Sequence, residues 1–125
     1  MAVVLVVDDE FGINEVLETL LAGEGHSVMT AHNGRAALAR LAERRPDAVL
    51  LDYMMPLLDG VGVMRAMQAQ PDWASVPVVF MSSLPEAAVR DHVSGYAGFL
   101  RKPFRIMEVL EALDRALGKA LLGRP

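Results

Sequence analysis

The sequence contains no cysteine, which excludes disulfide bonds, thiolate metal sites and catalysis by a thiol group. A chain without disulfides fits a reducing compartment. Basic residues are in the minority, with 12 lysines and arginines against 16 acidic residues and a formal net charge of −4. This charge argues against a surface for nucleic acid.

Long apolar runs and targeting signals are missing as well. No apolar stretch approaches the ~20 residues that a membrane-spanning helix requires. The N-terminal stretch MAVVLVVDDE lacks the basic start of a secretion signal and soon reaches acidic residues. We therefore expect a cytoplasmic protein that has no membrane partner.

The remaining composition is that of one globular domain. The 125 residues are 53% hydrophobic and 22% charged, and the chain shows no repeat, linker or low-complexity tract. A chain of this length can bury a sizeable core. We expect a single domain over residues 1–125, with its core at about residues 3–118.

Five short, mainly aliphatic runs are typical of strands buried in a parallel sheet. The second run is the least apolar of the longer ones, which indicates a position near the edge of the sheet. We expect the strands at these positions: Val3–Val7, Ser27–Ala31, Ala48–Asp52, Val76–Met81 and Phe99–Leu100.

Helices are predicted between these runs and after the last one, where apolar residues recur at helical spacing. The first helix should end near Gly23 and the third should begin near Asp59. The fourth should have Pro85 in its first turn and end at about Val93. The tail from Leu117 to Leu122 either extends the last helix or packs on a partner. The expected apolar faces are Ile13, Val16, Leu17, Leu20 and Leu21; Ala37, Leu38 and Leu41; Val61, Met64 and Met67; and Ile106, Met107, Val109, Leu110, Leu113 and Leu117.

This alternation predicts an α/β fold, a doubly wound parallel sheet with helices on both faces and right-handed crossovers. For five strands the common order is 2-1-3-4-5, which makes strands 1 and 3 neighbours. Ligands of such sheets bind at the carboxyl ends of the strands.

Polar residues close four of the predicted strands. Asp8 and Asp9 follow the first strand, Asp52 ends the third, Ser82 follows the fourth and Lys102 follows the fifth. Taken singly, each has an ordinary interpretation as a strand or helix cap, a loop hydroxyl or a surface charge. Because all of them fall at one edge of the predicted sheet, we interpret them as a single site.

Three carboxylates in one cleft repel one another, and a divalent cation relieves that repulsion. Oxygen ligands without histidine or cysteine favour Mg²⁺ or Mn²⁺. A lysine supplies a positive charge for a phosphoryl oxygen, and an aspartate oxygen can act as the nucleophile that accepts a phosphoryl group. The residues therefore predict an aspartate that is phosphorylated beside a magnesium ion.

Several motifs share the order and spacing of one known family. They are VLVVDDE, HNGRAAL, LLDYMMPLLDG, PVVFMSS and GFLRKPF, and they extend over about Val3 to Leu117. With them the sequence resembles the receiver domain of two-component response regulators, in its stand-alone form, as in chemotaxis regulators. The resemblance implies the flavodoxin-like (βα)5 fold.

The resemblance also implies roles for the site residues. Asp52 would be the phosphoacceptor, and Lys102 would hold a phosphoryl oxygen. Asp9 would bind Mg²⁺ directly and Asp8 mostly through water. The backbone carbonyl of Met54 would complete the protein ligands.

Further roles in the family concern switching and the lifetime of the phosphorylated state. Ser82 would be the switch hydroxyl, and Phe99 the aromatic ring that turns inward with it. The Lys102-Pro103 bond is expected to be cis. Met54 and Leu84 would flank the path of the hydrolytic water, and since both are apolar we expect slow self-dephosphorylation.

The expected function is therefore that of a phosphoacceptor in a phosphorelay, and not of an enzyme with a separate substrate. The donor would be a sensor histidine kinase or a histidine phosphotransfer protein. Phosphorylation would change the face made by the fourth helix, fifth strand and fifth helix, which would bind an unknown downstream protein. No DNA-binding segment follows within the 125 residues, so no nucleic-acid partner is expected; either the output is a protein–protein contact or these residues are part of a longer regulator. The protein would be a monomer or a phosphorylation-dependent homodimer.

Three other functions stay open on the residues alone. A small metal-dependent phosphatase or phosphotransferase would favour a D-x-D motif, but Asp8 and Asp9 are adjacent. A flavodoxin-type cofactor binder would need a Ser/Thr/Gly-rich loop after the first strand, where DDEFG stands instead. A scaffold that is never phosphorylated would not need the acidic residues.

Overall fold

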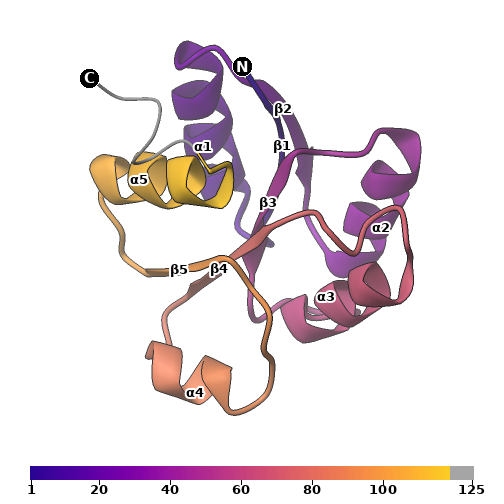
Figure 1. The fold of residues 1–125 in the computed structure, drawn as a ribbon. Helices are drawn as coiled ribbons and strands as arrows, with labels where there is room; N and C mark the ends of the chain where they lie inside the picture. The colour runs from indigo at the N-terminus through magenta and orange to yellow at the C-terminus, as the bar shows by residue number, and fades with distance from the viewer. Residues whose placement is uncertain (119–125) are drawn as a thin grey trace.

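The computed structural model describes residues 1–118, in which strands and helices alternate along the chain (Figure 1). The tail from Leu117 to Leu122, which is expected to extend the last helix or to pack on a partner, lies mostly outside these residues. Among the described helices, none has the length and hydropathy that crossing a bilayer requires. The elements are β1 (Val3–Val7), α1 (Phe11–Gly23), β2 (Ser27–Ala31), α2 (Gly34–Glu43), β3 (Ala48–Asp52), α3 (Gly60–Ala69), β4 (Val78–Ser82), α4 (Glu86–Arg90), β5 (Gly98–Arg101) and α5 (Ile106–Ala116).

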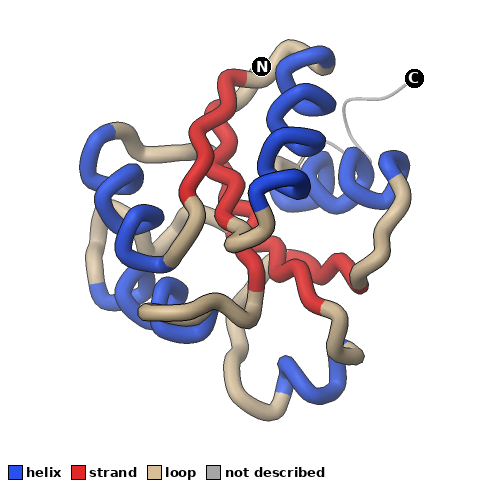
Figure 2. The backbone as a smooth tube through the Cα atoms, turned by 180° about the vertical axis from the view of Figure 1, so that it is seen from behind, coloured by secondary structure: helices blue, strands red, loops and turns tan. Residues whose placement is uncertain are grey.

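The five strands form one parallel sheet in the order β2-β1-β3-β4-β5. This is the order predicted from the alternation of strands and helices, with β2 at an edge as expected. The fold is the flavodoxin-like (βα)5 fold. Figure 2 shows the strands running through the centre of the molecule, with helices on both sides.

Each face of the sheet has its own hydrophobic core, because successive side chains of a strand point to opposite faces. In β1, Val4 and Val6 pack with α1 and α5, whereas Leu5 and Val7 pack with α2 and α3. Figure 1 shows these two pairs of helices on opposite sides of the sheet. Burial on both faces explains why the strands read as continuous aliphatic runs.

Some predicted element ends differ from those observed. Strand β4 begins at Val78 instead of Val76, because Pro77 has no backbone N–H to donate to a ladder. Pro85 lies just before α4 as its N-cap instead of in the first turn. The helix ends at Arg90 instead of Val93, since the next turn tightens to a bond from the N–H of His92 to the carbonyl of Val89.

Three residues assigned to apolar helix faces are exposed, and these assignments were wrong. Val16 is 61% exposed, Ile106 57% and Met107 63%. In α5 the buried stripe is narrower than predicted and contains Val109 and Leu113. In α1 the buried stripe is Asn14, Leu17 and Leu21, so it includes a polar residue that was not part of the predicted face.

Two close backbone contacts hold the segment between β3 and α3 against the sheet. The N–H of Gly60 donates to the carbonyl of Tyr53 at 3.0 Å, and a Cβ atom at Gly60 would lie 2.5 Å from the carbonyl oxygen of Asp52. Asp59 caps α3 by accepting from the N–H of Gly62 at 2.8 Å. The segment therefore returns directly to the carboxyl end of β3, where Asp52 stands.

Candidate functional site

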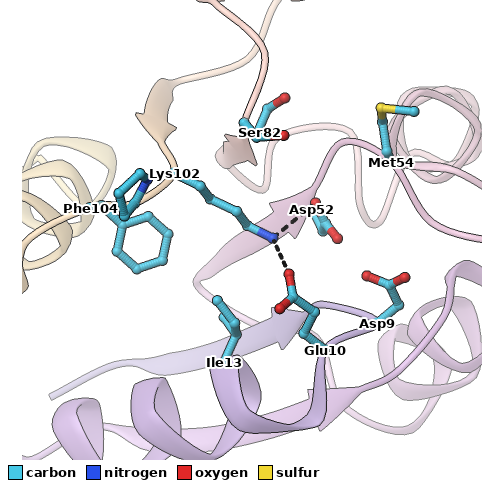
Figure 3. A pocket seen from close by; sticks show the side chains of 10 residues that line it. Asp9, Glu10, Ile13, Asp52, Met54, Ser82, Lys102 and Phe104 are labelled. Carbon is cyan, nitrogen blue, oxygen red and sulfur yellow. Dashed lines mark ion pairs between the residues drawn. The ribbon is translucent and has the colours of Figure 1, made fainter.

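The carboxyl ends of β1, β3, β4 and β5 surround an open cavity of about 490 Å³ (Figure 3). The strand order explains this convergence. Strands β1 and β3 are neighbours, and β4 and β5 follow on the other side of β3, so the carboxyl ends of all four strands lie at one edge of the sheet. The cavity is lined by Asp9, Glu10, Ile13, Asp52, Met54, Ser82, Ser83, Lys102, Pro103 and Phe104.

Three carboxylates meet at this edge of the sheet. Asp8, Asp9 and Asp52 each offer an oxygen atom, and these atoms lie within 4.8 Å of one another. Asp8 is fully buried, Asp52 is buried and Asp9 is exposed to solvent. The N–H of Glu10 donates to Asp8 Oδ1 at 2.9 Å and fixes that carboxylate. The structure thus gathers the acidic residues singled out in the sequence.

Lys102 provides the positive charge of the pocket. Its Nζ lies 2.8 Å from Asp8 Oδ2 and 3.4 Å from Asp52 Oδ1. Glu10 Oε1 is 3.6 Å away, as Figure 3 shows together with the contact to Asp52. The nearest partner of the ammonium group is therefore Asp8, and Asp52 is second.

The pocket contains more negative than positive charge, with one ammonium group among several carboxylates. Burial first, and then the charge of Asp8, raise the pKa of Asp52 to about 7. Asp9 adds to this rise and Lys102 opposes it. For Lys102 burial lowers the pKa, but the hydrogen bond with Asp8 and the charges of Asp52, Asp8 and Glu10 outweigh it and leave the pKa above its ordinary value.

The donor set fits a hard divalent cation. All three ligand groups are carboxylates, and the described residues bring no histidine or cysteine into this cluster. Two of the carboxylates are buried, where negative charge is most costly, and a single ammonium group contacts them. A bound dication would supply the missing positive charge.

Of the two residues expected to switch, Ser82 lines the cavity and Phe99 packs against the core beside Phe80. Ser82 is buried, and its Oγ accepts from the N–H of Leu84 at 3.0 Å. Phe99 is half-buried and pairs with Phe80 across β4 and β5. The Lys102-Pro103 bond is cis, as predicted.

The residues expected to control water access are both accessible. Met54 is 62% exposed and lines the cavity, as its side chain in Figure 3 shows. Leu84 is 37% exposed and follows Ser82 by two residues.

Two residues of the site were missed in the sequence. Glu10 directly follows the acid pair, and its position alone could have suggested a contact with Lys102. Asn14 is buried at 2% exposure and donates from Nδ2 to the carbonyl of Asp8 at 2.9 Å. The sequence could have indicated Asn14, because this polar residue precedes Leu17 and Leu21 at helical spacing on the buried stripe of α1.

Comparison with known proteins identifies the family. The family model of the response regulator receiver domain matches residues 4–114. The chain belongs to the receiver domain family of response regulators.

Curated relatives of this receiver are longer proteins. The response regulator MprA of Mycolicibacterium vanbaalenii is 41% identical over 118 residues, which cover 91% of this chain and 49% of MprA. The probable transcriptional regulator ycf27 of Guillardia theta is 40% identical over 118 residues, which cover 91% of this chain and 44% of ycf27. The receiver thus spans about half the length of these relatives or less.

Two solved structures share the fold over almost their whole length. The chemotaxis response regulator CheY4 of Vibrio cholerae has a TM-score of 0.88 and 31% identity, covering 94% of this receiver and 99% of CheY4. The receiver domain of the sensor histidine kinase PA1611 of Pseudomonas aeruginosa has a TM-score of 0.86 and 28% identity, with coverages of 94% and 98%. That structure has a magnesium ion coordinated in its active-site cleft.

Proposed function

We propose that this receiver accepts a phosphoryl group on Asp52, with Mg²⁺ bound beside it, from a histidine kinase or a histidine phosphotransfer protein. The observation that carries the proposal is the convergence of Asp8, Asp9, Asp52 and Lys102 in one open cavity at the edge of the sheet. Membership of the receiver family favours this function over the phosphatase and cofactor-binding alternatives.

Asp8, Asp9 and Asp52 would hold the metal together with the backbone carbonyl of Met54. The magnesium ion of the PA1611 receiver supports this assignment, and Mn²⁺ has the same preference for oxygen ligands. When bound, the ion neutralises the carboxylates and the incoming phosphoryl oxygens.

Asp52 would be the nucleophile. One of its carboxylate oxygens forms a bond to phosphorus while the bond from phosphorus to the donor's imidazole nitrogen breaks. The imidazole leaves with the electron pair of that bond. Lys102 lies 3.4 Å from Asp52 Oδ1, close enough to bind an oxygen of the transferred group.

Phosphorylation would then act on Ser82 and Phe99, with the Ser82 hydroxyl donating to a phosphoryl oxygen. The Ser82 oxygen accepts from the N–H of Leu84 at 3.0 Å, and its O–H can donate at the same time. The inward movement would alter the face formed by α4, β5 and α5, and that face would bind a downstream protein or a second copy of the receiver. Such a local charge change that biases a two-state surface is a general switching mechanism.

The receiver itself would catalyse only its own phosphorylation and dephosphorylation. Several relatives are named transcriptional regulators, and this chain covers only part of them. The expectation that nucleic acid is not a partner therefore stays a prediction for these 125 residues.

The direct test is to incubate the protein with acetyl phosphate and Mg²⁺ and measure its intact mass. The parent should gain one phosphoryl group, and Asp52→Ala should gain none. Asp72→Ala, which changes an exposed loop acid, should behave like the parent. A parent that gains no mass, or an Asp52→Ala variant that gains as much as the parent, would refute the proposal.

A further inference from the structure

We propose that Asn14 is a positioning residue, which fixes the turn of Asp8 and Asp9 in the orientation that the divalent cation requires. The inference rests on the proposed function, because it concerns how the same site binds its metal. Asn14 is a buried residue of α1 and is not among the residues that line the cavity.

The side chain of Asn14 ties two strand ends together. Its Nδ2 donates to the carbonyl of Asp8 at 2.9 Å and to the carbonyl of Ala31 at 3.1 Å. Asp8 follows β1 and Ala31 ends β2. The N–H of Asp8 also donates to the carbonyl of Ala31 at 3.2 Å, so the amide reinforces a backbone contact between neighbouring strands.

The orientation of the amide is determined by its partners. Turning it over would bring Oδ1 against the two carbonyl oxygens, where only a donor is favourable. Nδ2 is also 3.1 Å from His32 Nδ1, and the ring of His32 packs edge-on against Phe11 at a centroid distance of 5.3 Å. The donor side of Asn14 therefore has a fixed direction.

The oxygen atom of the Asn14 amide, in contrast, lowers the stability of the fold. Asn14 is 2% exposed, and its Oδ1 has no hydrogen-bond partner among residues 1–118. A buried oxygen without a donor is destabilising, and a leucine would continue the apolar stripe of Leu17 and Leu21. Packing therefore does not explain the asparagine, whereas its contact with the Asp8 carbonyl does.

That contact reaches the metal ligands through the backbone. The carbonyl of Asp8 and the N–H of Asp9 belong to one planar peptide unit. Holding this carbonyl sets the direction in which the Asp9 side chain leaves the chain. Asp8 is already fixed through its carboxylate, by Glu10 and Lys102, so the exposed Asp9 depends most on the peptide orientation.

The test compares Mg²⁺ affinities of the phosphate-free protein by calorimetry. Asn14→Leu keeps the approximate volume and removes both donors. We expect its dissociation constant to rise about tenfold, the lower end of the range typical for residues that orient metal ligands. Asn14→Ala should also raise the dissociation constant for Mg²⁺. This variant replaces Asn14→Leu in the test if the leucine variant does not fold.

Asn33→Ala is the matched control. Asn33 caps α2 by accepting from the N–H of Ala36 at 2.8 Å, and its loss should lower stability without changing Mg²⁺ affinity. If the Asn14 variants bind Mg²⁺ as tightly as the parent, or if Asn33→Ala weakens binding equally, the positioning role is refuted. A parent that binds no Mg²⁺ would instead refute the proposed function, and this inference with it.

Discussion

Lys102 is shared among three acids, and this sharing defines the chemistry of the pocket. Its ammonium group contacts Asp8 at 2.8 Å, Asp52 at 3.4 Å and Glu10 at 3.6 Å. Its side chain is 14% exposed, so a partner is needed to stabilise the charge. We expect a bound dication to take over the neutralisation of Asp8 and to leave Lys102 available for a phosphoryl oxygen.

Asp52→Asn should stabilise the metal-free protein at neutral and higher pH. The pKa of Asp52 is raised from 3.8 to about 7 on folding, so the folded state holds its proton longer than the unfolded state. This contribution to stability is complete below pH ~4 and is lost as the pH rises through ~7. From pH 4 to pH 8, the free energy of unfolding of the variant should therefore rise relative to that of the parent by on the order of 2–4 kcal/mol.

Urea unfolding in a chelator at both pH values measures this gain. Asp72→Asn is the control, because Asp72 is an exposed loop residue. A stability difference between parent and Asp52→Asn that does not change with pH would contradict the prediction.

The double variant Met54→Asn, Leu84→Glu should lose its phosphoryl group faster than the parent. Neither native side chain can orient a water molecule; both are exposed, and Met54 lines the cavity. One new hydrogen bond to the attacking water corresponds to about a tenfold higher rate. The decay of the phosphorylated mass after removal of acetyl phosphate gives the rate, and Met107→Asn, at an exposed position of α5, is the control. An unchanged decay rate in the double variant would show that these positions do not limit hydrolysis.

Between elements, the start of α2 packs closely against the segment that follows β3. A Cβ atom at Gly34 would overlap the carbonyl oxygen of Leu58 and lie 2.7 Å from its Cβ. Leu58 lies between Asp52 and the cap of α3, and Leu57 beside it has a φ of 72°. The glycine therefore allows the β3–α3 segment to rest on α2.

Gly34→Ala should lower the free energy of unfolding by about 1–3 kcal/mol, because backbone atoms must move to admit the methyl group. Gly12→Ala is the matched control in a helix, since a Cβ atom there meets nothing within 4 Å. The control should be neutral or stabilising by up to about 1 kcal/mol. Denaturant unfolding distinguishes the two, and equal stabilities would contradict the packing argument.

Helix α4 has the weakest attachment of the described helices by burial, since Val89 is its one buried residue. The hydroxyl of Tyr96 donates to Glu86 Oε2 at 2.9 Å, and the Tyr96 ring packs edge-on against Phe80 at 5.5 Å. Tyr96→Phe keeps the ring and removes the hydrogen bond, so amide exchange in α4 should become faster, by roughly fivefold for a bond of about 1 kcal/mol. Tyr53→Phe is the control, because its ring also packs against Phe80. Equal exchange in both variants would exclude a role for the hydroxyl.

At the scale of the whole molecule, two cores lie on either side of one sheet, and the site lies where four of the five strands end. The site at that edge combines residues that follow β1, end β3 and follow β5, so it forms only when the sheet is assembled. Metal binding should therefore stabilise the entire fold.

Mg²⁺ at ten times its dissociation constant should raise the free energy of unfolding by about 1.4 kcal/mol. For a domain of this size that corresponds to an increase in Tm of roughly 3–6 °C. Thermal unfolding with and without Mg²⁺ measures the shift, and Asp9→Ala should reduce it because that residue is the exposed carboxylate of the cluster. An equal shift in parent and variant would place the ion elsewhere.

The sequence by itself determined the fold and the composition of the site. Continuous aliphatic strands, alternating with helices, require a sheet covered on both faces, and parallel strands bring Asp8, Asp52, Ser82 and Lys102 to one edge. The sequence did not determine which residues of each helix face are buried, and Met107 is exposed although it lies at the predicted spacing. Spacing alone does not say how wide a stripe of the helix the neighbouring elements cover.

Only the tertiary structure decided the contacts within that edge. It placed Lys102 nearer to Asp8 than to Asp52, raised the pKa of Asp52 to about 7 and buried Asn14 against the Asp8 carbonyl. These properties depend on distances of a few ångströms and on burial between residues far apart in the chain. Strand patterns fix which ends meet, but they do not encode which atoms touch.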